Sequence, residues 1–95
     1  MAELKSYILE FTATALRELE KLDPSIRRGV FSGIEKLKEN PRPHGVQKIE
    51  TKAKLYRVHV GPGKNYRVIY QIRDEVLLVV VVKVGHQREV YRRLR

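Results

Sequence analysis

The chain has 95 residues and a mass of 11.1 kDa, with 20 Lys and Arg against 11 Asp and Glu. This length suits one domain of ordinary composition, and no apolar run approaches the roughly 18 residues of a membrane helix. The absence of Cys excludes disulfides and thiolate metal sites and fits a reducing compartment. We therefore expect a single domain over residues 1–95 in the cytoplasm.

The net charge of +9 arises in the second part of the chain. Residues 1–40 hold seven basic and seven acidic side chains, whereas residues 41–95 hold 13 basic and four acidic ones. A surplus segregated in this way indicates a surface that faces a polyanion. The alternative is a surface whose charge serves solubility alone.

The chain opens with a short apolar segment, Lys5–Phe11, which predicts a strand because Thr12 follows it as a plausible helix N-cap. A first helix is expected over Ala13–Leu22. Its apolar residues recur at helical spacing and would lie against a sheet: Ala15, Leu16, Leu19 and Leu22.

A second helix is expected from Asp23-Pro24 to about Glu39, because Pro suits the first helical position and Asn40-Pro41 then ends the pattern. One stripe carries its apolar residues: Ile26, Val30, Ile34 and Leu37. The two helices would form an αα-hairpin.

From residue 45 onward the apolar spacing changes to alternation, which is typical of strands. The expected strands are Val46–Glu50, Lys54–Val60 and Tyr66–Arg73, and Gly61–Asn65 would close a hairpin between the last two. Leu77–Val84 is apolar at nearly every position, which predicts a central strand buried on both faces.

The order of these segments predicts an α+β fold, with an antiparallel sheet of about four strands and the αα-hairpin packed on one of its faces. The element order is β-α-α-β-β-β, with one more strand if Val46–Glu50 pairs. The tail from His86 to Arg95 is expected to form a short terminal helix.

Alternation also sorts the side chains of the hairpin onto two faces. One face is apolar and the other carries Arg57, His59 and Arg67, with His59 opposite Arg67 if the loop closes symmetrically about Gly63. Such a cluster suits a phosphodiester backbone, because Arg offers a planar fork to phosphate oxygens and fixed charge to a pentacoordinate phosphorane. The alternative is an ordinary solvated sheet face.

The position of Lys83 depends on the turn after Arg73. A loop of odd length places Lys83 beside Arg67, whereas a two-residue turn at Asp74-Glu75 would send it to the opposite face. We prefer the first register, because an unpaired Lys in the helix-packed core would be costly.

The three His differ in context. His44 is a loop residue without an expected role, and His59 lies among cations that favour its neutral form. His86, after Gly85, either takes part in chemistry or caps a strand edge, and the structural interpretation is slightly favoured. None has metal-ligand spacing, so neither a metal nor another cofactor is expected.

Several segments resemble the RelE-type toxins of bacterial and archaeal toxin–antitoxin systems: Leu55–Val60, Asn65–Tyr70, Val82–His86 and Glu89–Tyr91. The two helices with Leu37 and Asn40-Pro41 also look like that family, so the resemblance covers almost the entire chain. It implies a microbial RNase-like fold and a ribosome-dependent endoribonuclease that cleaves mRNA in the aminoacyl site and inhibits translation. The implied chemistry is metal-independent attack by a 2′-hydroxyl that leaves a 2′,3′-cyclic phosphate.

The resemblance also implies roles for particular residues. Arg57 and His59 would activate the 2′-hydroxyl or neutralise charge, Arg67 would stabilise the transition state, and Tyr91 would stack on the base or move a proton. Gln87 departs from the family, where an Arg often follows the Gly-His pair. Either Arg88, one residue displaced, takes that place, or activity is reduced. The residues expected to contact RNA or the ribosome are Lys48, Lys52, Lys54, Lys64, Lys83, His86, Arg92 and Arg93.

The implied partners are mRNA, the ribosome and a RelB-like antitoxin whose C-terminal segment is expected to be acidic. The toxin is expected to be monomeric, to form larger assemblies only with the antitoxin, and not to bind membranes. Two alternatives remain open. One is a ParE-like toxin that inhibits DNA gyrase and cleaves nothing, and the other is an RNA-binding domain without catalysis.

Overall fold

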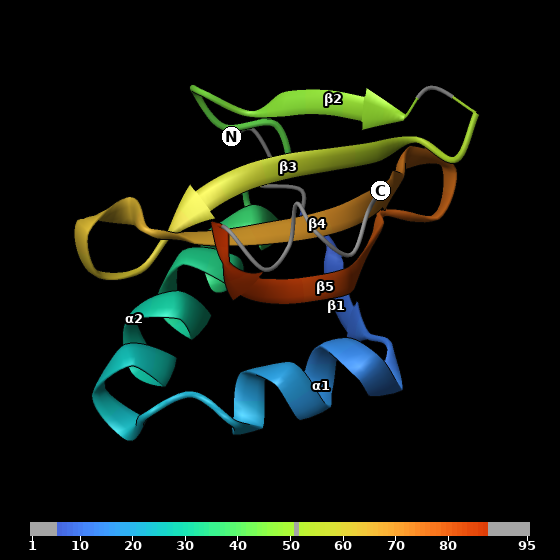
Figure 1. Cartoon of the computed structure of the whole chain (residues 1–95). Coiled ribbons are helices and arrows are strands. Elements are labelled where there is room, and N and C mark those ends of the chain that lie inside the picture. Colours follow the sequence, from blue (N-terminus) through green and yellow to red (C-terminus); the bar gives the residue numbers. More distant parts are fainter. Residues whose placement is uncertain (1–5, 51, 88–95) are drawn as a thin grey trace.

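A computed structural model of the chain describes residues 6–50 and 52–87. Two helices lie on one side of a five-stranded sheet whose order is β1-β5-β4-β3-β2 (Figure 1). The strands are β1 (Ile8–Phe11), β2 (Gln47–Glu50), β3 (Leu55–Val60), β4 (Tyr66–Arg73) and β5 (Leu78–His86). The predicted α+β class, with both helices on one sheet face, is confirmed.

The sheet differs from the prediction in the placement of its first strand. β1 pairs with β5 in parallel, with Ile8 opposite Leu78, while all other neighbours are antiparallel. The sheet therefore has five strands, rather than about four, and is mixed. Two helices and three strands separate β1 from β5 along the chain, and parallel neighbours need such a crossover connection instead of a tight turn.

Both helices begin where the sequence predicts and end earlier. Thr12 is the N-cap of α1 (Ala13–Glu20), and its hydroxyl accepts a hydrogen bond from the Ala15 N–H at 3.1 Å. α2 (Pro24–Glu35) continues as a single 3₁₀ turn, Lys36–Lys38. Neither helix has the length or the apolar character that crossing a bilayer demands, and the same holds for the other helical turns in the described part of the chain.

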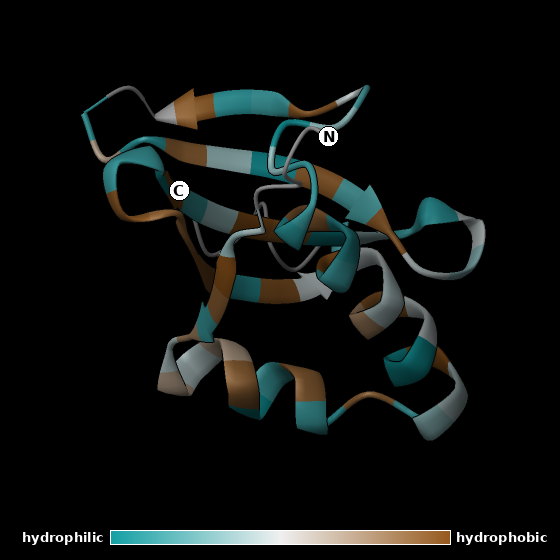
Figure 2. Cartoon of the chain, turned by 180° about the vertical axis from the view of Figure 1, so that it is seen from behind, coloured by the Kyte–Doolittle hydropathy of each residue, from teal (hydrophilic) through white to brown (hydrophobic). Residues whose placement is uncertain are grey.

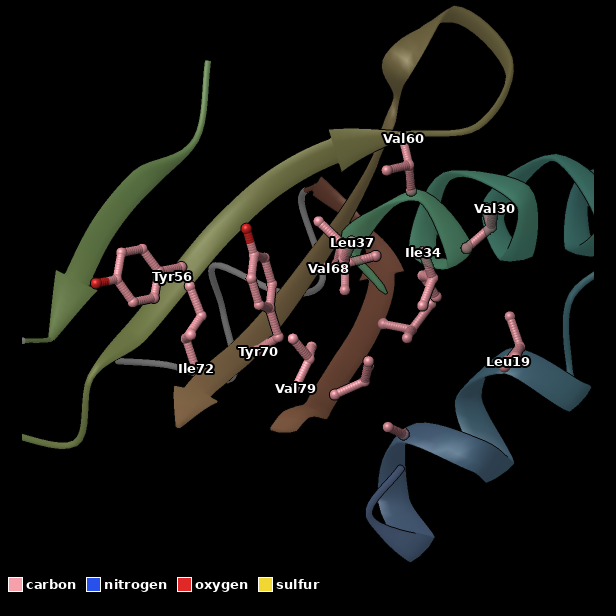
Figure 3. Close-up of a cluster of buried hydrophobic side chains, with 13 residues drawn as sticks. Leu19, Val30, Ile34, Leu37, Tyr56, Val60, Val68, Tyr70, Ile72 and Val79 are labelled. Atoms are coloured by element: carbon pink, nitrogen blue, oxygen red, sulfur yellow. The ribbon is translucent and has the colours of Figure 1, made fainter. Parts of the chain in front are cut away.

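The core lies between the helices and the sheet. Val30, Ile34 and Leu37 point from α2 and its 3₁₀ turn toward side chains of β3 and β4 (Figure 3). Leu16 was expected in this layer but is 45% exposed, because it lies about 100° around α1 from the buried Ala15. Viewed from behind, the strands change between hydrophilic and hydrophobic residues along their length, as a sheet with one covered face requires (Figure 2).

β5 is an interior strand as predicted, but its two faces are buried unequally. Val79, Val81 and Val84 are buried on the helix side, while Val80 and Val82 are only partly covered. The register shifts between the pair of Tyr70 with Val81 and the pair of Ile69 with Lys83, which leaves Val82 as the extra residue of a β-bulge.

The bulge decides where Lys83 lies. The connection after Arg73 has four residues, Asp74–Leu77, so the expected loop of odd length is wrong. The extra residue at Val82 shifts the alternation by one, and Lys83 still occupies the sheet face of Arg67.

A polar cluster fixes the segment that leads into β2. Arg42 donates to both carboxylate oxygens of Asp74, at 3.1 and 2.8 Å, and the Tyr7 hydroxyl donates to the same carboxylate at 2.7 Å. These hydrogen bonds lower the pKa of Asp74 to about 2. The buried Tyr70 hydroxyl donates to the Pro41 carbonyl at 2.8 Å. This segment therefore enters β2 from a fixed position.

Candidate active site

The β3–β4 hairpin brings three cationic or titratable side chains together. His59 lies directly opposite Arg67, and Arg57 lies two residues before His59 on β3. Directly opposed residues on antiparallel strands share one face, with about 5 Å between their Cβ atoms. The predicted juxtaposition of Arg57, His59 and Arg67 is confirmed, and we call these residues the cationic face.

The loop that sets this register depends on glycine. Gly61 has φ of +79°, in the left-handed region, and a Cβ there would meet the Val30 side chain at 2.9 Å. Gly63 has φ of +63° and lies in the 3₁₀ turn Pro62–Lys64. The loop closes symmetrically between Val60 and Tyr66, which pair with each other. The glycines thus fix the alignment of His59 with Arg67.

The electrostatics of the face keep its histidine neutral. The pKa of His59 is lowered from its ordinary value of 6.5, first by partial desolvation and then by the charges of Arg67, Arg57 and Lys64. Arg67 is only 9% exposed, so its charge acts with little screening by solvent. A neutral imidazole beside fixed cations combines a proton acceptor with groups that stabilise negative charge.

Sequence reasoning missed one polar member of the face. Gln47 begins β2 directly opposite Arg57, and its side-chain oxygen accepts a hydrogen bond from Arg57 Nη2. No local signal in the sequence identifies it. A bulge between Lys48 and Glu50 shifts the alignment of β2 with β3, and nothing in the sequence marks the extra residue.

Two residues predicted to contact RNA lie on the helix side of the sheet instead. Lys48 is opposite Tyr56, and its Nζ is 5.9 Å from the centre of that ring. His86 pairs with Tyr66, and their rings meet edge to face at 5.5 Å. The structure does not bring these two residues together with the cationic face.

Lys83 occupies the sheet face of Arg67 but is ion-paired. Its Nζ lies 3.3 Å from a carboxylate oxygen of Glu18, which also accepts the Val84 N–H at 2.9 Å. Three other predicted contacts are exposed at turns: Lys52, Lys54 and Lys64. The terminal helix was predicted to begin at His86, which instead ends β5. The other residues assigned to it, Arg88, Tyr91, Arg92 and Arg93, lie outside the described residues.

A groove of about 550 Å³ lies between α2 and β3, on the helix side of the sheet. Its lining includes Val58, Val60, His44, His59 and Lys64. His59 itself is exposed. Among residues 6–50 and 52–87, no three His, Asp or Glu side chains gather as a metal site would require.

Comparison with known proteins identifies the family. The sequence model of a family described as the ParE toxin of type II toxin–antitoxin systems, parDE, matches residues 9–91. The chain is 34% identical over 88 residues to the toxin RelG of Mycobacterium tuberculosis, covering 92% of this chain and 98% of that toxin. This chain belongs to the RelE/ParE family of type II toxins.

Other members of the RelE/ParE family agree in sequence and in structure. The mRNA interferase toxin RelE of Escherichia coli K12 is 31% identical over 88 residues, covering 90% of each chain. The isolated RelE toxin of Escherichia coli superposes with a TM-score of 0.72 at 27% identity, covering 95% of this chain and 100% of that one. The toxin of the intact Escherichia coli RelBE complex superposes with a TM-score of 0.70 at 30% identity, covering 85% and 96%.

Proposed function

We propose that this toxin is a ribosome-dependent endoribonuclease that cleaves mRNA in the aminoacyl site and thereby inhibits translation. The observation that carries the proposal is the alignment of Arg57, His59 and Arg67 on the sheet face away from the helices. Two relatives named mRNA interferases, from Escherichia coli and Shigella flexneri, support the same class of reaction at 31% identity.

The proposed reaction cleaves a phosphodiester without a metal. Neutral His59 takes the proton of a ribose 2′-hydroxyl, and the 2′-oxygen forms a bond to the adjacent phosphorus. The bond from phosphorus to the 5′-oxygen breaks, Tyr91 or Arg88 gives that oxygen a proton, and a 2′,3′-cyclic phosphate and a 5′-hydroxyl result. Arg57 and Arg67 stabilise the charge on the nonbridging oxygens. The ribosome supplies the alignment of the strand.

The proposal is tested with the Arg67→Ala variant on ribosomes programmed with a defined mRNA. Because Arg67 faces the developing charge, we expect cleavage, mapped by primer extension, to fall at least about 100-fold. Arg73→Ala is the matched control, since Arg73 lies on the same strand and face about 20 Å away. Equal activity in Arg67→Ala and the wild type, or product ends without a cyclic phosphate, would contradict the proposal.

The name of the matching family model favours a second candidate, inhibition of DNA gyrase without cleavage. The same preparation is therefore added to a gyrase supercoiling reaction. We expect supercoiling to proceed normally at toxin concentrations that cleave mRNA. Loss of supercoiling, together with intact mRNA on ribosomes, would select the second candidate.

An antitoxin is the proposed protein partner. Solved structures of relatives include toxin–antitoxin complexes from Mycobacterium tuberculosis and Escherichia coli. The net charge of +9 suits an acidic segment in the partner of this chain. Such a segment would compete with mRNA for the cationic face.

A further inference from the structure

Gln47 lies on the edge strand β2, on the same side of the sheet as the cationic face. It pairs directly with Arg57 across β2 and β3, and paired residues project to the same side of a sheet. Arg57 Nη2 donates a hydrogen bond to Gln47 Oε1. The contact therefore follows from the strand register and joins two side chains on the face that would bind RNA.

Backbone hydrogen bonds on both sides of Gln47 hold its position in the sheet. The turn before β2 is closed by a hydrogen bond from the Val46 N–H to the Pro43 carbonyl at 3.1 Å, and Gly45 has φ of +88°. Gln47 then enters the ladder with β3. A side chain on a paired strand holds its partner more precisely in place than one on a loop.

The chemistry of an amide suits this task. The Gln47 oxygen fixes the direction of the guanidinium, and because the amide is neutral, Arg57 keeps its full charge for a phosphate. A carboxylate at the same position would also accept the hydrogen bond, but it would cancel that charge and repel RNA.

We propose that Gln47 is a positioning residue for Arg57, holding its guanidinium in the direction from which it stabilises the transition state. This inference rests on the proposed ribonuclease function. Gln47 makes no bond to the reacting atoms in this scheme and acts through Arg57 alone.

The first test is a double-mutant cycle on programmed ribosomes. Gln47→Ala is expected to lower kcat about tenfold and leave KM within about twofold, because a misdirected cation costs most in the transition state. In the Arg57→Ala background, the same substitution should have no further effect. Gln47→Glu is expected to raise KM, since it adds a negative charge to the face.

Gln71→Ala is the matched control. Gln71 lies on the same sheet face, but its side-chain amide donates to the Ala53 carbonyl at 2.8 Å instead of to an arginine. Gln71→Ala should lower thermal stability. Any change that it causes in activity should be the same in the wild-type and in the Arg57→Ala background. A similar result for Gln47→Ala would reduce Gln47 to a structural residue.

A second readout is independent of activity. Nuclear magnetic resonance of the arginine side chains should show slower rotation of the Arg57 guanidinium in the wild type than in Gln47→Ala, with Arg73 unchanged. Two results would overturn the positioning role while leaving the proposed function intact, provided that the wild type cleaves mRNA. One is an equal rotation rate of the Arg57 guanidinium in the wild type and in Gln47→Ala. The other is additive effects of Gln47→Ala and Arg57→Ala on cleavage. A wild-type chain that leaves ribosome-bound mRNA intact would overturn the proposed function, and the role in catalysis with it.

Discussion

His59 lies opposite the buried Arg67, and its pKa is lowered first by partial desolvation and then by the charges of Arg67, Arg57 and Lys64. The lowered pKa of His59 means that its imidazole is neutral at pH 7 and protonated only in more acidic solution. A histidine in this state is ready to accept a proton, whereas Arg57 and Arg67 supply positive charge to the face. The protonation states of these side chains therefore set their roles: His59 accepts a proton, and Arg57 and Arg67 stabilise negative charge.

This arrangement predicts the pH dependence of cleavage. The rate should rise with pH along a limb whose midpoint lies below 6.5, because only the neutral imidazole accepts the proton. Arg57→Ala removes a cation that lowers the pKa of His59, so an NMR titration of the imidazole should move to higher pH in this variant. Lys64→Ala should shift it by less and Arg73→Ala should not shift it. A midpoint that stays unchanged in Arg57→Ala would disprove the assigned cause.

At the scale of elements, the β3–β4 hairpin could be predicted from the sequence. Its loop is short, its glycines mark the turn, and alternation then assigns every side chain to a face. The same reasoning failed for β1, because nothing local to Ile8–Phe11 indicates β5 as its neighbour. The sequence therefore predicts pairings across short turns better than those across long connections.

The candidate site shows a second limit, which is set by β-bulges. Arg57, His59 and Arg67 were predicted to lie together because they share one hairpin. Gln47 was missed, and the helix-side position of Lys48 was not predicted, because the alignment of β2 depends on a bulge. At Val82, consecutive valines give no sign of which residue is extra, although that residue decides the face of Lys83.

The contact between α2 and β3 supports the hairpin and predicts a sensitive glycine. A Cβ at Gly33 would lie 2.7 Å from both Cβ and Cγ1 of Val60. Gly33→Ala should therefore lower the free energy of unfolding by about 1–3 kcal/mol, despite the better helix propensity of Ala. The control is Ser32→Ala, at an exposed position of the same helix, which should be neutral or slightly stabilising. Denaturant unfolding measures both, and a stabilised Gly33→Ala would show that α2 is free to move away from β3.

In the whole molecule, the layer of helices and the layer of strands differ in net charge. Residues 1–40, which include both helices, carry no net charge, and their apolar stripes cover one side of the sheet. Residues 41–87 hold nine basic and three acidic side chains, mostly in the strands and their turns, but not all of these charges reach the cationic face. Lys83 is paired with Glu18, and Lys48 lies over Tyr56 on the helix side. The effective binding surface is therefore smaller than the net charge of +9 implies.

This distribution of charge predicts how salt changes the rate at which the toxin binds an antitoxin with an acidic segment. The association rate constant should fall about tenfold or more between 0.05 and 0.5 M salt, because long-range attraction is screened while short-range contacts persist. Stopped-flow mixing with a RelB-like antitoxin that binds the chain measures this rate, and the dissociation rate constant should change little. Arg57→Ala should weaken the salt dependence, whereas Arg28→Ala, at an exposed position of α2, should not. If salt instead left the association rate constant unchanged, apolar contacts, and not the charge of the cationic face, would govern recognition.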